Sequence, residues 1–176
     1  MRRRALLAAA VLLTAGCLYP GAEAPDVRTA PLVVAEMLRM ATVTSTDVVY
    51  DLGSGDGRLV IGAAQQFGAR GVGVEIDPKL VAESRKNAER AKVQSRVRFV
   101  EGDLFQTDLR EATVVTLYLG KELNMRLRPK LLSELKPGSR VVSHDFDMGD
   151  WKPDRVQKFL SPEREHVLYL WTIPPR

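Results

Sequence analysis

Residues 48–57 decide the fold of this chain, and they read Val48-Val49-Tyr50-Asp51-Leu52-Gly53-Ser54-Gly55-Asp56-Gly57. The apolar residues predict a buried strand that ends at Asp51, and the glycines predict a loop that opens a helix over 58–67. An open α/β sheet binds its ligands at such a loop, beyond the carboxyl end of the strand. Glycines at every second position differ from the G-x-G-x-x-G of dinucleotide sites, and Asp56 would repel a pyrophosphate. We therefore expect a ligand that has no pyrophosphate group.

Strands and helices alternate downstream of this loop. The apolar runs predict strands over 71–75, 97–100, 114–119 and 140–143, with helices over 78–91 and 123–135 between them. A short helix over 33–40 precedes them, and extended segments over 155–160 and 166–173 follow a turn signal. This order predicts an α/β fold, a Rossmann-like, doubly wound and mostly parallel sheet closed by a C-terminal antiparallel hairpin.

An acidic residue ends each of the first three predicted strands: Asp51, Glu75 and Asp103. A carboxylate at Glu75 can accept hydrogen bonds from ribose hydroxyls, and Asp103 lies where an adenine amino group would sit. The alternative is that each acid caps a helix or solvates a loop. Three acids in this order favour a nucleoside ligand over that alternative.

The chain resembles the class I S-adenosylmethionine-dependent methyltransferases over about residues 29–173. More narrowly, it resembles the lysine methyltransferases of the ATP synthase c-subunit and of the adenine nucleotide translocase, with their bacterial relatives. The stretches that carry the resemblance are Thr29-Ala30-Pro31, Asp51 to Arg58, Gly73-Val74-Glu75, Leu135 to Ser143 and Ser143 to Trp151. The resemblance implies S-adenosyl-L-methionine as the cofactor. The expected cofactor-binding residues are Thr29, Asp51, Gly53, Ser54, Gly55, Gly57, Glu75, Ile76, Asp103 and Leu104.

The expected methyl-acceptor site follows the fourth and fifth strands. Tyr118 could line a lysine channel, although it could equally be a core aromatic residue at a strand end. Asp145 or Asp147 could hold an incoming ammonium group, or could simply solvate a loop, and His144 is a weaker candidate for a general base. We therefore predict Tyr118 and Asp145 as catalytic residues. Related enzymes that methylate planar nitrogens carry Asn-Pro-Pro-Tyr or Asp-Pro-Pro-Tyr at this point, and this chain does not.

Charge and composition narrow the choice of acceptor. Of 26 basic residues three are Arg2, Arg3 and Arg4, which leaves 26 − 3 = 23 against 22 acidic residues. Because the rest of the chain is so close to neutral, we predict that it has no surface for binding nucleic acid. The single cysteine, Cys17, excludes an internal disulfide, and His144 and His166 are far apart in sequence without metal-ligand spacing, so we predict no metal site.

We expect a monomeric protein-lysine methyltransferase. The alternatives are a small-molecule methyltransferase and a non-catalytic, envelope-tethered protein that retained the cofactor fold.

The N-terminus has the three parts of an export signal. Arg2 to Arg4 are basic, Ala5 to Leu13 are apolar, and Thr14-Ala15-Gly16-Cys17 resembles the end of a lipoprotein signal. The apolar run is shorter than the ~20 residues that span a bilayer. We predict a signal and tether over 1–24 and a methyltransferase domain over 25–176. The expected location is the cell envelope, by membrane attachment or export, or the cytosol if the signal is not used.

Overall fold

The computed structural model describes residues 28–176, so the predicted signal and tether over 1–24 lie outside the described residues. The elements in chain order are α1 (Pro31–Met40), β1 (Val48–Leu52), α2 (Arg58–Phe67), β2 (Arg70–Glu75), α3 (Pro78–Arg90), β3 (Val97–Glu101), β4 (Val114–Leu117), α4 (Lys121–Glu134), β5 (Arg140–His144), β6 (Arg155–Leu160) and β7 (Glu165–Thr172). No helix in 28–176 is long and apolar enough to span a bilayer.

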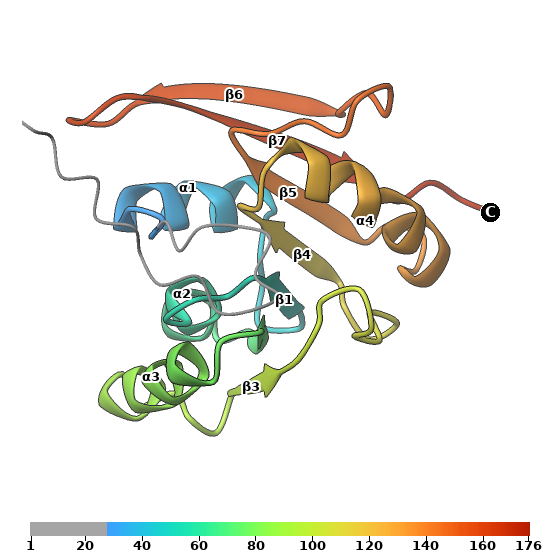
Figure 1. Cartoon of the computed structure of the whole chain (residues 1–176). Coiled ribbons are helices and arrows are strands. Elements are labelled where there is room, and N and C mark those ends of the chain that lie inside the picture. The colour runs from blue at the N-terminus through green and yellow to red at the C-terminus, as the bar shows by residue number, and fades with distance from the viewer. Residues whose placement is uncertain (1–27) are drawn as a thin grey trace, which may run out of the picture.

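The strands form one seven-stranded sheet in the order β3-β2-β1-β4-β5-β7-β6 (Figure 1). The first five strands along the chain run parallel, while β7 pairs antiparallel with both β5 and β6. The predicted α/β fold with a C-terminal hairpin is confirmed. The strand order changes direction between β1 and β4, and ligands bind at such a switch point in open α/β sheets.

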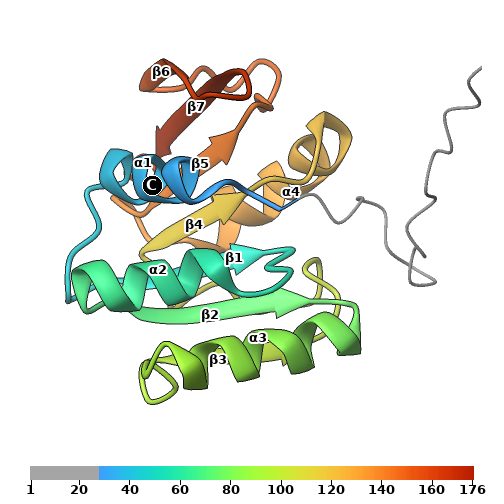
Figure 2. The same ribbon diagram turned by 90° about the vertical axis from the view of Figure 1, so that its left-hand side faces the viewer.

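Helices cover both faces of the sheet. In Figure 2, α1, α2 and α3 lie in front of the sheet and α4 lies behind it. Each face has its own core: Val49, Val114 and Val142 face α1 to α3, whereas Leu52, Val115 and Val141 face α4. Neighbouring residues of one strand therefore point to opposite layers, which explains why β1 and β4 are apolar at every position but one or two.

The edge strand β6 is the most exposed strand of the sheet. It has a neighbour, β7, on one side only, and its Val156 and Leu160 are 50% and 79% exposed. Arg155 and Lys158 share this strand with them.

Three boundaries differ from the sequence prediction by two residues. Helix α1 begins at Pro31 rather than at residue 33, because proline at a first helical position loses no hydrogen bond. Helix α4 begins at Lys121 rather than Leu123. Strand β4 ends at Leu117, two residues before the predicted end, because Leu119 packs against Gly53 of the glycine loop instead of continuing the strand.

Candidate functional site

The glycine loop after β1 depends on backbone conformations that other residues rarely adopt. Gly53, Gly55 and Gly57 have φ angles of +79°, +52° and +82°. The N–H groups of Gly53 and Ser54 both donate to the Val74 carbonyl at 2.9 Å, which fixes the loop against the end of β2. A Cβ at Gly57 would lie 2.6 Å from the Phe99 ring. The missing Cβ at Gly57 therefore lets Phe99 of β3 pack directly against the loop backbone.

Glu75 ends β2 with its carboxylate turned to this loop. The Oε2 atom accepts the Gly55 N–H at 2.9 Å, and Oε1 accepts the N–H groups of Ile76 and Asp77 at 2.8 and 3.0 Å. A carboxylate has about four lone-pair positions, so about one is left for a ligand hydroxyl. Glu75 is thus placed to bind a ribose, as expected, and it also holds the loop.

Asp51 lies under the loop at the end of β1 and is 5% exposed. Burial raises the pKa of this carboxyl group to about 7, the Thr116 hydroxyl opposes the rise through a 2.6 Å hydrogen bond, and the charges of Glu75 and Asp56 add to it. Near neutral pH the group is therefore close to its titration point, and a positively charged ligand would favour its ionised form.

Two arginines hold the carboxylate of Asp56 beside the glycine loop. Its carboxylate binds Arg58 twice, through Nε at 2.9 Å and Nη2 at 2.6 Å, and pairs with Arg28 at 3.6 Å. Burial would raise the pKa of Asp56, but the hydrogen bonds and charge of Arg58 hold it below its usual range. Arg58 also donates to the Thr29 carbonyl at 2.6 Å. This clamp fixes Thr29, a predicted site residue, beside the glycine loop.

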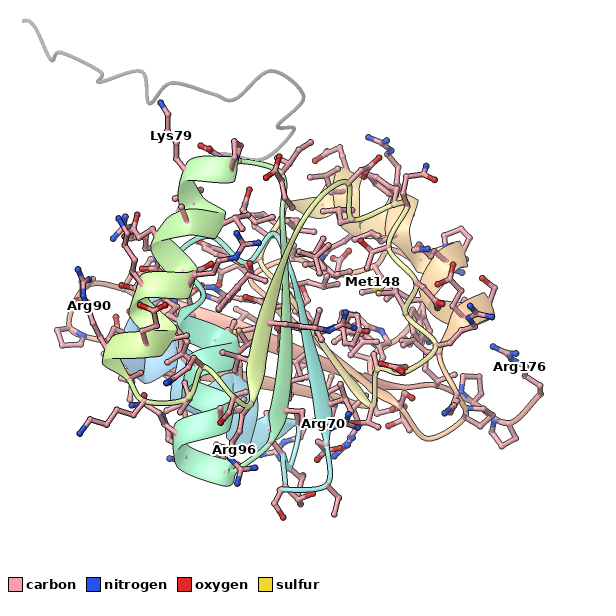
Figure 3. The ribbon with its side chains drawn as sticks, turned by 90° about the horizontal axis from the view of Figure 1, so that it is seen from below. Arg70, Lys79, Arg90, Arg96, Met148 and Arg176 are labelled. Atoms are coloured by element: carbon pink, nitrogen blue, oxygen red, sulfur yellow. The ribbon has the colours of Figure 1, made fainter. Side chains whose placement is uncertain are left out.

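The remaining predicted cofactor residues follow β2 and β3. Asp103 is exposed, and its Oδ1 accepts the Phe105 N–H at 2.8 Å, as a turn-forming acid does. Ile76 and Leu104 are half-buried at the same edge. Figure 3 shows this edge from another side: Lys79, in the first turn of α3, lies at the opposite end of the sheet from Arg70 and Arg96. The parallel strands thus bring Asp51, Glu75 and Asp103 together at the carboxyl ends of β1, β2 and β3.

Tyr118 and Asp145, the predicted catalytic residues, lie close together beyond β4 and β5. Arg164 joins them: its guanidinium donates to the Tyr118 hydroxyl at 3.3 Å and forms an ion pair with Asp145. Burial would raise the pKa of Asp145, but Arg164 keeps it below its usual range. The Tyr118 ring lies against the His144 ring, with centroids 4.1 Å apart and planes tilted by 34°. The negative charge of Asp145 is therefore already balanced by the Arg164 guanidinium.

Asp147 lies apart from this group. It accepts the Gly149 N–H at 2.9 Å and pairs with Lys121 at 3.3 Å, and the first of these contacts is the main cause of its lowered pKa. Asn124 of α4 was not predicted from sequence, yet it connects the layers by donating to Ser143 at 2.9 Å and to the Phe146 carbonyl at 3.1 Å.

The two histidines are neighbours, which the sequence argument missed. His144 Nε2 lies 2.9 Å from His166 Nδ1, because antiparallel pairing of β7 with β5 brings residues 22 positions apart into contact. Both side chains are buried, at 1% and 5% exposure. Burial lowers the pKa of His144, so its imidazole is neutral near pH 7. Arg164 was missed for the same reason, because it precedes β7 in the hairpin turn.

The sheet order, the glycine loop and the acids ending β1, β2 and β3 define the chain as a class I S-adenosylmethionine-dependent methyltransferase. Residues 51–155 match the ANTKMT methyltransferase domain family, and the chain belongs to this family.

Two relatives and one solved structure show how close the likeness is. The chain is 45% identical over 150 residues to a protein-lysine N-methyltransferase of Saccharolobus islandicus, covering 85% of this chain and 93% of that protein. It is 37% identical over 123 residues to the ATP synthase c-subunit lysine N-methyltransferase of Xenopus laevis, covering 70% of this chain and about half, 52%, of that protein. A crystal structure described as an RNA methyltransferase from Salinibacter ruber, in complex with S-adenosyl-L-homocysteine, is 57% identical with a TM-score of 0.80, covering 85% of this chain and 95% of that one.

Proposed function

We propose that this methyltransferase transfers the methyl group of S-adenosylmethionine to the side-chain nitrogen of a lysine in a protein. The observation that carries the proposal is the likeness to the Saccharolobus islandicus protein-lysine N-methyltransferase, which extends over nearly the whole of that protein. The lysine N-methyltransferase of the ATP synthase c-subunit in Xenopus laevis supports the same acceptor, although the chain spans only about half of that enzyme.

The residues beyond β1 to β3 fit the cofactor. The glycine loop turns with left-handed backbones at Gly53, Gly55 and Gly57, and Glu75 presents a buried carboxylate at its edge. When bound, the cofactor supplies an electrophilic methyl group. Glu75 would accept a ribose hydroxyl, and Ile76 and Leu104 offer apolar surface for the adenine.

The residues beyond β4 and β5 fit an amine acceptor. The half-buried Tyr118 ring forms an aromatic wall, and a narrow, partly dry site disfavours the ammonium form that cannot accept a methyl group. Asp145 cannot hold an incoming ammonium while Arg164 neutralises it. We therefore assign Asp145 a positioning role, in which it holds Arg164 and, through Arg164, the Tyr118 hydroxyl.

Methyl transfer to RNA is the second candidate, and the 57% identity to the Salinibacter ruber structure favours it. Charge opposes it. Near the acceptor side, Lys121, Arg128 and Arg164 each pair with an aspartate: Asp147, Asp150 and Asp145. Paired cations bind phosphates weakly, because the aspartate competes for the same charge. The lysine acceptor is therefore the proposal that the surface supports.

The test is incubation of the full chain with radiolabelled S-adenosylmethionine and a lysate of the source cell, followed by separate counting of protein, RNA and small molecules. We expect label on lysines, located by mass spectrometry. Tyr118→Ala should abolish labelling and Asp145→Asn should weaken it. Arg70→Gln, on an exposed residue that begins β2 at the opposite end of the parallel strands, should leave it unchanged. Label in RNA, or in small molecules with none on protein, would overturn the acceptor assignment.

We also propose that the chain, as a monomer, is attached to the cell envelope through its N-terminus. The basic, apolar and small-residue segments of residues 2–17 support this location.

A further inference from the structure

Two imidazoles and the carboxylate of Asp145 meet at the end of β5, next to Tyr118 and Arg164 of the proposed acceptor site. His144 Nε2 lies 2.9 Å from His166 Nδ1 and 3.2 Å from Asp145 Oδ2, and the three ligand atoms lie within 4.8 Å of one another. Two atoms that bind one zinc-sized ion at about 2.1 Å are about 3.0–3.4 Å apart for angles between a right angle and the tetrahedral angle. Two of the separations are therefore close to those of a metal site.

Hydrogen bonding at Ser161 fixes the tautomer of His166. The Ser161 hydroxyl donates its proton to Glu163 Oε2 at 2.7 Å, so it can only accept from His166 Nε2, 3.0 Å away. His166 Nε2 thus carries the proton, and Nδ1 offers a lone pair toward His144. Metal-binding histidines are commonly oriented in this way, with the second ring nitrogen donating to an oxygen.

His144 has a polar atom without a partner. Its Nδ1 is buried and has no hydrogen-bond partner among the described residues. Because His166 Nδ1 carries a lone pair, His144 Nε2 donates the proton between the two rings. Moving this proton to Nδ1 would free Nε2 as a second ligand without any net loss of a proton.

The backbone at Asp145 holds the third ligand in place. Asp145 has a φ of +61°, a left-handed conformation that few residues other than glycine adopt. Its Oδ1 accepts the Val167 N–H at 3.1 Å, which leaves Oδ2 turned toward His144. Strained residues of this kind are often found at functional sites.

We propose that His144 Nε2, His166 Nδ1 and Asp145 Oδ2 form a binding site for a divalent transition-metal ion of the zinc class. Two imidazoles and a carboxylate are the ligand set that such ions prefer, whereas Mg²⁺ and Ca²⁺ prefer oxygen ligands alone. The ion would join the end of β5 to the start of β7 beneath the Tyr118 ring. This inference does not depend on the identity of the methyl acceptor.

Arg164 is the competitor for this site. Its guanidinium is paired with Asp145 Oδ2, the oxygen that would bind the ion, and its side chain is 44% exposed. It can therefore turn into solvent when a metal binds. Removing its charge should tighten metal binding, because a positive group beside a cation opposes it.

The test uses the tag-free full chain carrying Cys17→Ser, so that no thiol remains and the only two histidines of the chain are those of the site. Co²⁺ titration, followed by its visible absorption band, should show one equivalent bound, and Zn²⁺ should displace it. His166→Gln keeps an amide for Ser161 but lacks Nδ1, so it should weaken binding at least about 100-fold, as should Asp145→Ala. Circular dichroism of each variant checks its fold.

Arg164→Gln should bind Co²⁺ more tightly than the parent chain. Lys158→Gln is the matched control, because Lys158 lies in the same hairpin and pairs with Glu165 at 3.5 Å rather than with the cluster. It should leave the affinity unchanged. The proposal is overturned if the parent chain gives no Co²⁺ band, if folded His166→Gln binds as the parent does, or if Arg164→Gln does not bind more tightly than Lys158→Gln.

Discussion

Among single residues, Glu75 connects the shape of the glycine loop to ligand binding. Its carboxylate accepts hydrogen bonds from three backbone N–H groups, one in the glycine loop and two just before α3. Such charge-assisted hydrogen bonds are each worth about 1.5–3 kcal/mol. Losing the carboxylate would therefore loosen the loop and remove the group that we propose as a ribose ligand.

Glu75→Ala should lower the affinity for S-adenosylhomocysteine at least tenfold and should also lower the melting temperature. The first effect follows from the lost ligand and the second from the lost backbone bonds. Calorimetric titration and thermal unfolding measure the two. Glu101→Ala is the control, since Glu101 pairs with Glu75 in the sheet register but is exposed, and it should change neither quantity. Unchanged affinity in Glu75→Ala would contradict the assignment.

Asp51 should make the free energy of unfolding depend on pH. Its pKa in the folded protein is about 7, above the ordinary value of 3.8, so the folded state binds the proton more tightly than the unfolded state. Stability therefore falls as pH rises from about 4 to about 7, by at most about 1.4 kcal/mol per unit, and is constant above. Asp51→Asn should lack this component. Urea unfolding at several pH values compares the two proteins, and identical pH profiles would refute the assignment.

The sequence predicted the positions of the glycine loop and its acids better than the contacts around Tyr118. Asp51 and Glu75 could be predicted because a strand followed by a glycine loop places them without knowledge of the rest of the fold. Arg164 and His166 could not, since they contact Tyr118 and His144 only through the pairing of β7 with β5. No local pattern encodes such a contact.

Among the elements, the loop between β1 and α2 has the least tolerance for change. Gly57 has a left-handed backbone, and an added Cβ would lie within 2.9 Å of both the Phe99 ring and Ser84. Phe99 of β3 thus packs against the start of α2. The loop is shaped by a side chain two strands away in the sheet, as well as by its own glycines.

Gly57→Ala should destabilise the protein by at least about 1–2 kcal/mol through backbone strain alone, with more from the contact with Phe99. Cofactor binding should weaken with it. Gly102→Ala is the matched control at the end of β3, where an added Cβ meets nothing within 4 Å, and it should stay within about 0.5 kcal/mol. Chemical denaturation measures both. Equal stability of the two variants would show that the Gly57 conformation is dispensable.

Element boundaries were predictable where local signals set them. Helix α2 runs over Arg58–Phe67 as predicted, between two glycines with left-handed backbones. The end of β4 was not predictable, because Leu119 is as apolar as a strand residue and its packing on Gly53 is a tertiary contact. Hydrophobicity alone does not distinguish these two kinds of burial.

At the scale of the whole molecule, the two halves of the sheet carry different groups of candidate site residues. The half built from β1, β2 and β3 carries the acids and the glycine loop, and the half built from β4, β5 and β7 carries Tyr118, Asp145 and the two histidines. The chain completes the first half before it begins the second, so the predicted cofactor residues all precede the proposed acceptor residues in the sequence.

The N-terminus adds a prediction for the full chain. Expressed in a bacterial host, the protein should fractionate with membranes, and Cys17→Ser should release it or change its location, because Cys17 is the residue that a lipoprotein signal would modify. Immunoblotting of membrane and soluble fractions measures this. An unprocessed protein with Met1 intact in the soluble fraction would refute the attachment.

The exposed edge strand β6 has a consequence for how copies of the protein meet. A free strand edge can pair with another strand, and exposed apolar residues such as Leu160 favour that pairing. Arg155 and Lys158 lie on the same strand, so two copies aligned edge to edge would bring like charges together. Lysine and arginine on β6 therefore act against fibrous self-association, and they protect the colloidal stability of a chain whose body carries almost no net charge.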